Sequence, residues 1–181
     1  MRIPLATGVA FAVFISGSGA FASSSTPLPG GANQRSSVEG CMHQTLFDGF
    51  WRFKVTSVNL VKEFSYTDTK AWAVAIEIRN ARTTDTTPAL VGVGQPQLVL
   101  ADGTVLDMDT DSGIAYGRQV SYANLPPGGS AHGTLYFRPD TNTSKPDKLL
   151  LAVSPRNPVY HTLWGYPVKD PSFRVHLNCT K

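Results

Sequence analysis

The chain has 181 residues, with 16 basic and 13 acidic side chains and a formal net charge of +3. That length suits one domain with a sizeable hydrophobic core. The basic residues are scattered along the sequence, whereas nucleic-acid binding needs Lys and Arg concentrated opposite phosphates. We therefore expect no nucleic-acid partner.

The first 22 residues have the features of a secretory signal peptide. Arg2 supplies a positive start, the stretch from Leu5 to Ile15 is mostly apolar, and Ala20-Phe21-Ala22 matches the small-x-small pattern at a cleavage site. A membrane anchor is the alternative, but the apolar run is shorter than the roughly 20 residues that a spanning helix needs. The sequence predicts a secreted or periplasmic protein with no membrane anchor, and residues 1–22 as its signal peptide.

Residues 23–37 are rich in Ser, Pro, Gly and Asn, and they offer few apolar side chains for burial. Such composition is typical of a flexible leader. We expect a single folded domain over residues 38–181, with order beginning near Val38 or Cys41.

The only two cysteines, Cys41 and Cys179, stand at the two ends of this predicted domain. An oxidising compartment and an even count favour a disulfide between them. Zinc binding is the alternative, but two isolated cysteines lack the paired spacing of a zinc site. A bridge across more than 100 residues should contribute about 4–5 kcal/mol by the chain-entropy estimate.

Apolar and polar residues alternate along several segments, which is the pattern of half-buried β-strands. Trp51 to Thr56 alternates cleanly, and the phase then slips before Val58, which predicts a β-bulge near Ser57. Trp72 to Ile78 alternates over seven residues. Trp51 and Trp72 fall on the apolar faces, so we expect both to pack in the core.

The second half of the chain repeats this pattern between turn signals. Residues 97–100 and 104–108 flank Ala101-Asp102-Gly103, an Asp-Gly hairpin signal. The remaining expected strands follow in order: 133–138 after the Pro-Gly cluster of 125–129, then 149–153, then 173–177 with Arg174, His176 and Asn178 facing outward. The sequence thus predicts an all-β, antiparallel β-sandwich of seven to eight strands, with a closed barrel as the alternative.

Three motifs in this order carry a family resemblance. They are Lys54-Val55-Thr56-Ser57-Val58; then Ile76-Glu77-Ile78-Arg79-Asn80 followed by Leu98-Val99-Leu100-Ala101-Asp102-Gly103; and Leu125-Pro126-Pro127-Gly128-Gly129 leading to Gly133-Thr134-Leu135-Tyr136-Phe137. Over residues 50–154 the chain resembles the secreted bacterial immunoglobulin-like domains related to the mycobacterial immunoprotective extracellular antigen. The resemblance implies an immunoglobulin-like sandwich exported by a bacterium. That family has no agreed biochemical activity, so it assigns no functional residues here.

The segment from Pro155 to Pro171 departs from that pattern and is the first candidate site. Its aromatic and imidazole side chains stand among prolines, which limit the entropy lost on ordering. Aromatic side chains on a rigid loop are typical of recognition surfaces, while packing over an open end of the sandwich is the alternative. The candidate partner-binding residues are Tyr160, His161, Trp164 and Tyr166.

A second candidate is a weak calcium site at Asp107, Asp109 and Asp111, whose carboxylates alternate along the chain. The match to an EF-hand loop fails at its sixth position, where Ser112 replaces Gly, and at its twelfth, where Arg118 replaces the bidentate Glu. A solvated acidic loop is the alternative. The four histidines are dispersed in sequence and predict no metal cluster.

No catalytic motif is apparent. The chain from residue 23 onward contains no Gly-x-Ser-x-Gly elbow, and bridged cysteines leave no thiol nucleophile. We expect a non-enzymatic binding module without a cofactor, whose partner is a protein or a cell-envelope component. The alternatives are a protease-inhibitor-like sandwich and a small hydrolase whose site forms only in the fold. The sequence does not set the oligomeric state.

Overall fold

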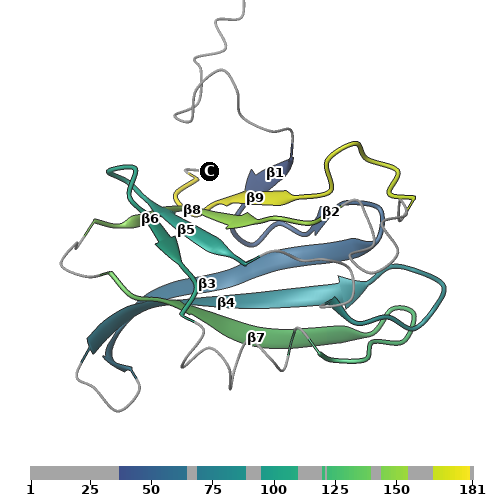
Figure 1. Ribbon diagram of the computed structural model, residues 1–181, viewed down its shortest axis with the longest axis horizontal. Coiled ribbons are helices and arrows are strands. Elements are labelled where there is room, and N and C mark those ends of the chain that lie inside the picture. Colours follow the sequence, from purple (N-terminus) through teal and green to yellow (C-terminus); the bar gives the residue numbers. More distant parts are fainter. Residues whose placement is uncertain are drawn as a thin grey trace, which may run out of the picture. The chain divides into compact units, whose positions relative to one another are not determined.

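The computed structural model describes residues 37–64, 69–88, 95–109, 120, 122–139, 144–154 and 165–179. All of them belong to one compact unit, Arg35–Lys181. The predicted signal peptide and the leader up to residue 36 lie outside the described residues. Strands of this unit form two sheets, seen one above the other in Figure 1. Among the described residues, no helix is long and apolar enough to cross a membrane.

The four-stranded sheet has the order β2-β3-β4-β7 and is antiparallel throughout. Its strands are β2 (Leu46–Phe47), β3 (Trp51–Phe64), β4 (Thr69–Asn80) and β7 (Ser130–Phe137). The β3–β4 register shifts between Val55 and Ser57, which confirms the predicted bulge. Thr56 sits at this shift, and its hydroxyl donates to the Ala75 carbonyl at 3.2 Å.

The five-stranded sheet has the order β1-β9-β8-β5-β6. Its strands are β1 (Val38–Cys41), β5 (Gln97–Leu100), β6 (Val105–Asp107), β8 (Pro146–Leu151) and β9 (Phe173–His176). The predicted hairpin is β5–β6, whose turn residue Gly103 has the positive φ of 88° that glycine adopts freely. One pair departs from the expected antiparallel pattern, because β1 runs parallel to β9. The first and last strands of the unit are therefore neighbours at one edge.

The core lies between the sheets and is built from the alternating apolar positions that the sequence indicates. Trp51, Phe53 and Val55 of β3 are fully buried, and the ring of Phe53 stacks on Phe173 of β9 at 5.2 Å between centroids. Each such side chain contributes on the order of 1.5–3 kcal/mol through burial. Trp72 is half-buried and packs against the same core, so both tryptophans are structural, as expected.

A buried asparagine fixes the end of β4. The Asn80 side-chain amide donates to the carbonyls of Thr84 and Leu125, at 2.8 and 2.9 Å, while its side-chain oxygen accepts from the Arg82 amide at 2.8 Å. Its backbone pairs with Gly128 and Gly129. Because its side-chain nitrogen and oxygen both bond to protein groups, Asn80 is buried at little cost and joins β4 to the turn before β7.

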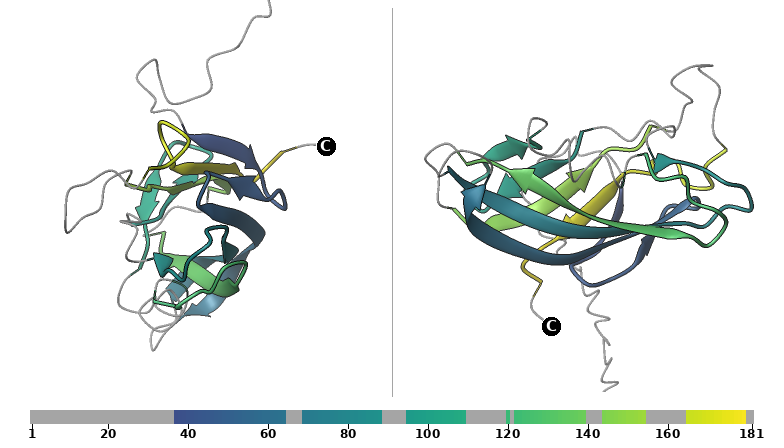
Figure 2. Two further views of the ribbon diagram at one scale, coloured as in Figure 1. Left: turned by 90° about the vertical axis from the view of Figure 1, so that its right-hand side faces the viewer. Right: turned by 90° about the horizontal axis from the view of Figure 1, so that it is seen from below.

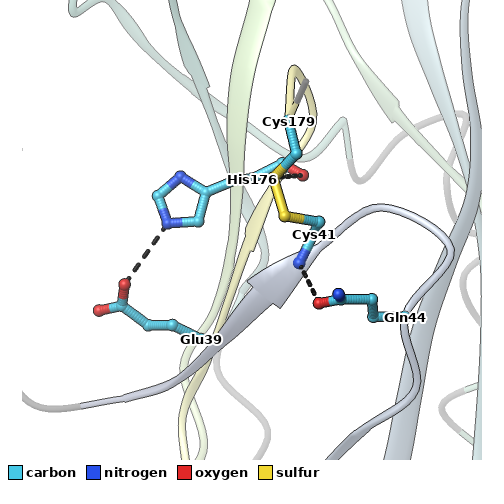
Figure 3. Close-up of a disulfide and its surroundings, with 5 residues drawn as sticks. All are labelled: Glu39, Cys41, Gln44, His176 and Cys179. Carbon is cyan, nitrogen blue, oxygen red and sulfur yellow. Dashed lines mark hydrogen bonds and ion pairs between the residues drawn. A yellow bond between two sulfur atoms is a disulfide. The ribbon is translucent and has the colours of Figure 1, made fainter. Parts of the chain in front are cut away.

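The two ends of the unit are tied by the predicted disulfide, which is confirmed. Cys41 and Cys179 are bonded with their Cα atoms 5.9 Å apart, across 138 positions of sequence. Figure 3 shows the bridge joining the end of β1 to the residues just after β9. Gln44 caps the same corner, since its side-chain oxygen accepts from the Cys41 amide at 2.9 Å.

Candidate functional site

A row of five side chains crosses the outer face of the five-stranded sheet. The strand registers place Glu39, Arg174, Leu150, Gln97 and Asp107 opposite one another, on β1, β9, β8, β5 and β6 in turn. Their neighbours along each strand, such as Phe173 and Leu149, point into the core. The row is therefore the outward set of a sheet whose strands alternate between two faces.

Polar contacts hold both ends of this row. Arg174 donates to one carboxylate oxygen of Glu39, and the other oxygen lies 3.4 Å from His176 Nε2. At the far end the Gln97 amide donates to Asp107 at 2.9 Å. Arg174 faces outward as predicted, yet it is 7% exposed. Such burial of a guanidinium is tolerable because Glu39 supplies a charged partner.

A hollow of about 150 Å³ lies at the centre of the row. Leu150 and Ala152 give it an apolar lining, Gln97 and Arg174 contribute polar groups, and Ser37 and Ser172 also line it. Cavities near 150 Å³ accommodate a benzene-sized group. Sites for cofactors and drug-sized ligands run from about 300 to 1,000 Å³. The hollow therefore has room for one apolar side chain.

Ser37, Glu39 and His176 beside this hollow are the residue types of a hydrolytic triad, but their order differs from a triad. Glu39 accepts from the Ser37 hydroxyl at 3.3 Å and contacts His176 at 3.4 Å, so the carboxylate stands between the other two. In a catalytic triad the imidazole stands between serine and carboxylate, where it can take the hydroxyl proton. This arrangement does not activate Ser37 as a nucleophile.

A second polar group is buried where the β2–β3 turn meets the segment before β9. Asp48 is 0% exposed, and its Oδ1 accepts from the backbone amides of Phe50 and Trp51 at 2.8 and 2.7 Å. The ring of Tyr166 packs on Phe50 with centroids 4.1 Å apart, and Arg82 covers the same Phe50 ring at 4.6 Å. We call these five residues the Asp48 cluster.

Burial shifts the titration of both acidic groups in the Asp48 cluster. Desolvation raises the pKa of Asp48 from 3.8 to about 6, against the lowering effect of the backbone hydrogen bonds. Desolvation also raises the pKa of Tyr166, and the negative charge of Asp48 adds to the rise, while Trp51 and Arg82 oppose it. The Trp51 indole thus favours the phenolate, although the two groups fall short of hydrogen-bond geometry.

The structure describes only some of the predicted site residues. Of the candidate partner-binding residues, Tyr160, His161 and Trp164 lie outside the described residues. Tyr166 is half-buried, and its phenol oxygen is inaccessible to solvent. In the structure Tyr166 packs on Phe50 within the Asp48 cluster.

The calcium candidate is likewise described in part. Asp107 accepts from Gln97, Asp109 pairs with Arg138, and Asp111 lies outside the described residues. Within the described ranges, no three His, Cys, Asp or Glu side chains gather as a metal-binding group. The calcium site stays a prediction.

Comparisons with known proteins show a shared fold. No family model matches the sequence, and no curated protein is significantly similar to it. Among solved structures, the chain is similar to the yjhA protein of Bacillus subtilis, with 14% identity over 76% of this chain and 99% of that one and a TM-score of 0.50. It is also similar to MPT63, a secreted protein of Mycobacterium tuberculosis, with 16% identity over 79% and 99% and a TM-score of 0.49.

An uncharacterised β-sandwich protein of Clostridium difficile is a further match, with 9% identity over 80% of this chain and 97% of that one and a TM-score of 0.48. At such identities a likeness concerns the fold alone. The protein is an all-β sandwich of two sheets, as predicted, and it shares its fold with the yjhA protein.

Proposed function

We propose that the protein is an exported, non-enzymatic binding module that recognises another protein by seating one apolar side chain in the hollow beside Leu150. The observation that carries the proposal is an apolar depression of about 150 Å³ on the outer face of a sheet, between polar groups. Buried anchors that fill such pockets dominate the energy of many protein interfaces.

The chemistry around the hollow favours a peptide-like partner. Gln97 keeps its side-chain oxygen as an acceptor while its amide bonds to Asp107, and it lines the hollow opposite Arg174. An apolar side chain of the partner would contact Leu150 and Ala152, and the peptide groups on either side of it could bond to Gln97 and Arg174. The volume, by contrast, is below the range of cofactor sites.

Export fits this role. The predicted signal peptide, residues 1–22, directs the chain out of the cytoplasm. Outside the cytoplasm, an oxidising environment lets the Cys41–Cys179 bridge persist. The aromatic residues Tyr160, His161 and Trp164 are proposed as further contacts of the same module. Trp164→Ala should then weaken partner capture with little loss of thermal stability, whereas a large stability loss would assign the residue to packing.

The test fills the hollow without disturbing the core. Ala152 lines the hollow and is exposed, so Ala152→Trp places an indole there at small cost to the fold. Ala101→Trp is the matched control, because Ala101 is also exposed, in the β5–β6 turn, and does not line the hollow. The probe is N-acetyl-phenylalanine amide at millimolar concentration, followed by amide chemical shifts in the protein.

We expect the probe to shift the amides around Leu150 and Gln97 in the wild type and in Ala101→Trp, and to lose this effect in Ala152→Trp. A natural partner captured from the extracytoplasmic fraction should show the same preference when it is purified and titrated. Probe shifts that are absent, or that survive Ala152→Trp, would remove the hollow as the binding site.

A further inference from the structure

Two segments distant in sequence meet at the Asp48 cluster. One is the β2–β3 turn, residues 48–50, and the other is Gly165–Pro167, which leads into β9. The Phe50–Tyr166 ring contact and a close approach of Gly49 to Pro167 join them. Each segment also has a glycine with positive φ, 103° at Gly49 and 72° at Gly165.

The Gly49–Pro167 approach leaves no room for a side chain on the turn. A Cβ built on Gly49 would lie 2.0 Å from Pro167 Cγ, far inside van der Waals contact. The Pro167 ring therefore fits against the turn only because residue 49 is glycine. The contact between the segments is a closely fitted surface.

The polar groups inside this contact are incompletely satisfied. Within the described part of the chain, Asp48 Oδ2, Trp51 Nε1 and the Tyr166 hydroxyl are buried and have no hydrogen-bond partner. A neutral acid can be buried in this way at moderate cost, whereas a buried carboxylate with one bare oxygen costs far more. The cost of keeping the contact closed thus depends on whether Asp48 carries a proton.

The charges that face Asp48 do not offset this cost. Within the described residues, backbone hydrogen bonds are what favour the Asp48 anion, and no side-chain cation is among the causes of its pKa shift. Tyr166, from the segment before β9, is neutral near pH 7 because its pKa is raised above the ordinary value of 10.0. Arg82, from the connection after β4, acts on Tyr166 and lies over the Phe50 ring.

We propose that the contact between residues 48–50 and Gly165–Pro167 is a proton-operated latch, closed when Asp48 is protonated and loosened when Asp48 ionises. Ionisation leaves a buried negative charge near Tyr166, and lifting Gly165–Pro167 lets water reach it. The latch does not depend on the proposed partner, because it involves none of the residues that line the hollow.

Hydrogen exchange measures the latch directly. With Asp48 titrating near pH 6 when closed and near 3.8 when hydrated, the opening equilibrium should rise about tenfold between pH 5 and pH 7.5. The amides of the non-proline residues between 165 and 172 should lose protection by that factor after correction for intrinsic rates. The amides of Val74 and Leu135, in the centre of the four-stranded sheet, should show no change.

Asp48→Asn supplies the decisive variant. The asparagine oxygen can still accept from Phe50 and Trp51, but the side chain cannot ionise, so the difference between pH 5 and pH 7.5 should vanish. Asp85→Asn, at an exposed acid, should retain the wild-type difference. Equal protection at both pH values in the wild type, or a pH dependence that persists in Asp48→Asn, would overturn the latch.

A second measurement covers the case in which Asp48→Asn does not fold. The carboxyl carbon of Asp48 can be titrated by NMR in the wild-type protein, and a midpoint near 6 that coincides with the loss of protection supports the latch. A midpoint near the ordinary aspartate value would show that water reaches Asp48 in the native state, and would refute the proposal.

Discussion

The last part of the chain is connected to the segment 37–50 at two places. One connection, the first fastening, is a strand pair closed by a disulfide, and the other, the second fastening, is a noncovalent contact. At one, β9 pairs with β1 over four residues and the Cys41–Cys179 bond closes the edge. At the other, Tyr166 packs on the ring of Phe50, and the ring of Pro167 lies close against Gly49 of the β2–β3 turn. Figure 2 shows the two sheets from two further directions.

The two connections differ in the partners that they give to a carboxyl group. Beside the disulfide, the Glu39 carboxylate has Arg174 and His176 as partners, so that its charge is compensated. In the Asp48 cluster the carboxyl has two backbone donors on one oxygen and none on the other. The first connection is closed by a covalent bond, whereas the second should depend on whether Asp48 carries a proton.

The largest effect is expected from breaking the covalent fastening. Replacing both cysteines, Cys41→Ser with Cys179→Ser, should lower the free energy of unfolding by about 3–5 kcal/mol, because the bridge closes a very long loop in the unfolded chain. Urea unfolding of the oxidised wild type and the double variant measures it. A loss below about 1 kcal/mol would mean that the β1–β9 ladder holds this edge without the bridge.

The pH dependence of stability tests the other fastening. The pKa of Asp48 is raised from 3.8 to about 6 on folding, so the folded protein holds this proton more tightly than the unfolded chain. The free energy of unfolding should therefore fall as pH rises from about 4 to about 6, by up to about 3 kcal/mol, and stay level above. Opening of the latch would make this decrease in the free energy of unfolding smaller, because it hydrates the Asp48 carboxylate.

Urea unfolding at intervals from pH 4 to pH 7.5 checks this, and the difference between wild type and Asp48→Asn removes the contribution of other carboxylates. The asparagine variant should show the flatter curve. Stability that rises through this window in the wild type but not in the variant would give the Asp48 shift the opposite sign.

Much of the fold follows from local pattern. Alternation of apolar residues identified β3 and β4, and the phase slip after Val55 located a bulge to within a residue. The Asp-Gly signal found the β5–β6 turn, because a tight turn requires the positive φ that Gly103 adopts. These features depend on neighbours in sequence, which a single chain displays directly.

The sites depend on contacts that sequence spacing does not reveal. The hollow requires β9 to lie between β1 and β8, and the four residues of β1 are too few to be recognised by alternation. Asp48-Gly49 reads as an ordinary turn between Phe47 and Phe50. Nothing in that pattern shows that Tyr166 will pack on Phe50 or that Asp48 will be buried.

The smallest effect distinguishes two roles for the Tyr166 hydroxyl. Tyr166→Phe keeps the ring on Phe50 and removes a buried hydroxyl without a full hydrogen bond, so the free energy of unfolding should rise by up to about 1 kcal/mol. Tyr122→Phe, at a tyrosine that is 68% exposed, should change it by almost nothing. Urea unfolding at pH 5 and pH 7.5 measures both variants. If Tyr166→Phe instead destabilises the protein at pH 7.5 and not at pH 5, the phenol donates to ionised Asp48 and keeps the second fastening closed after the proton has left.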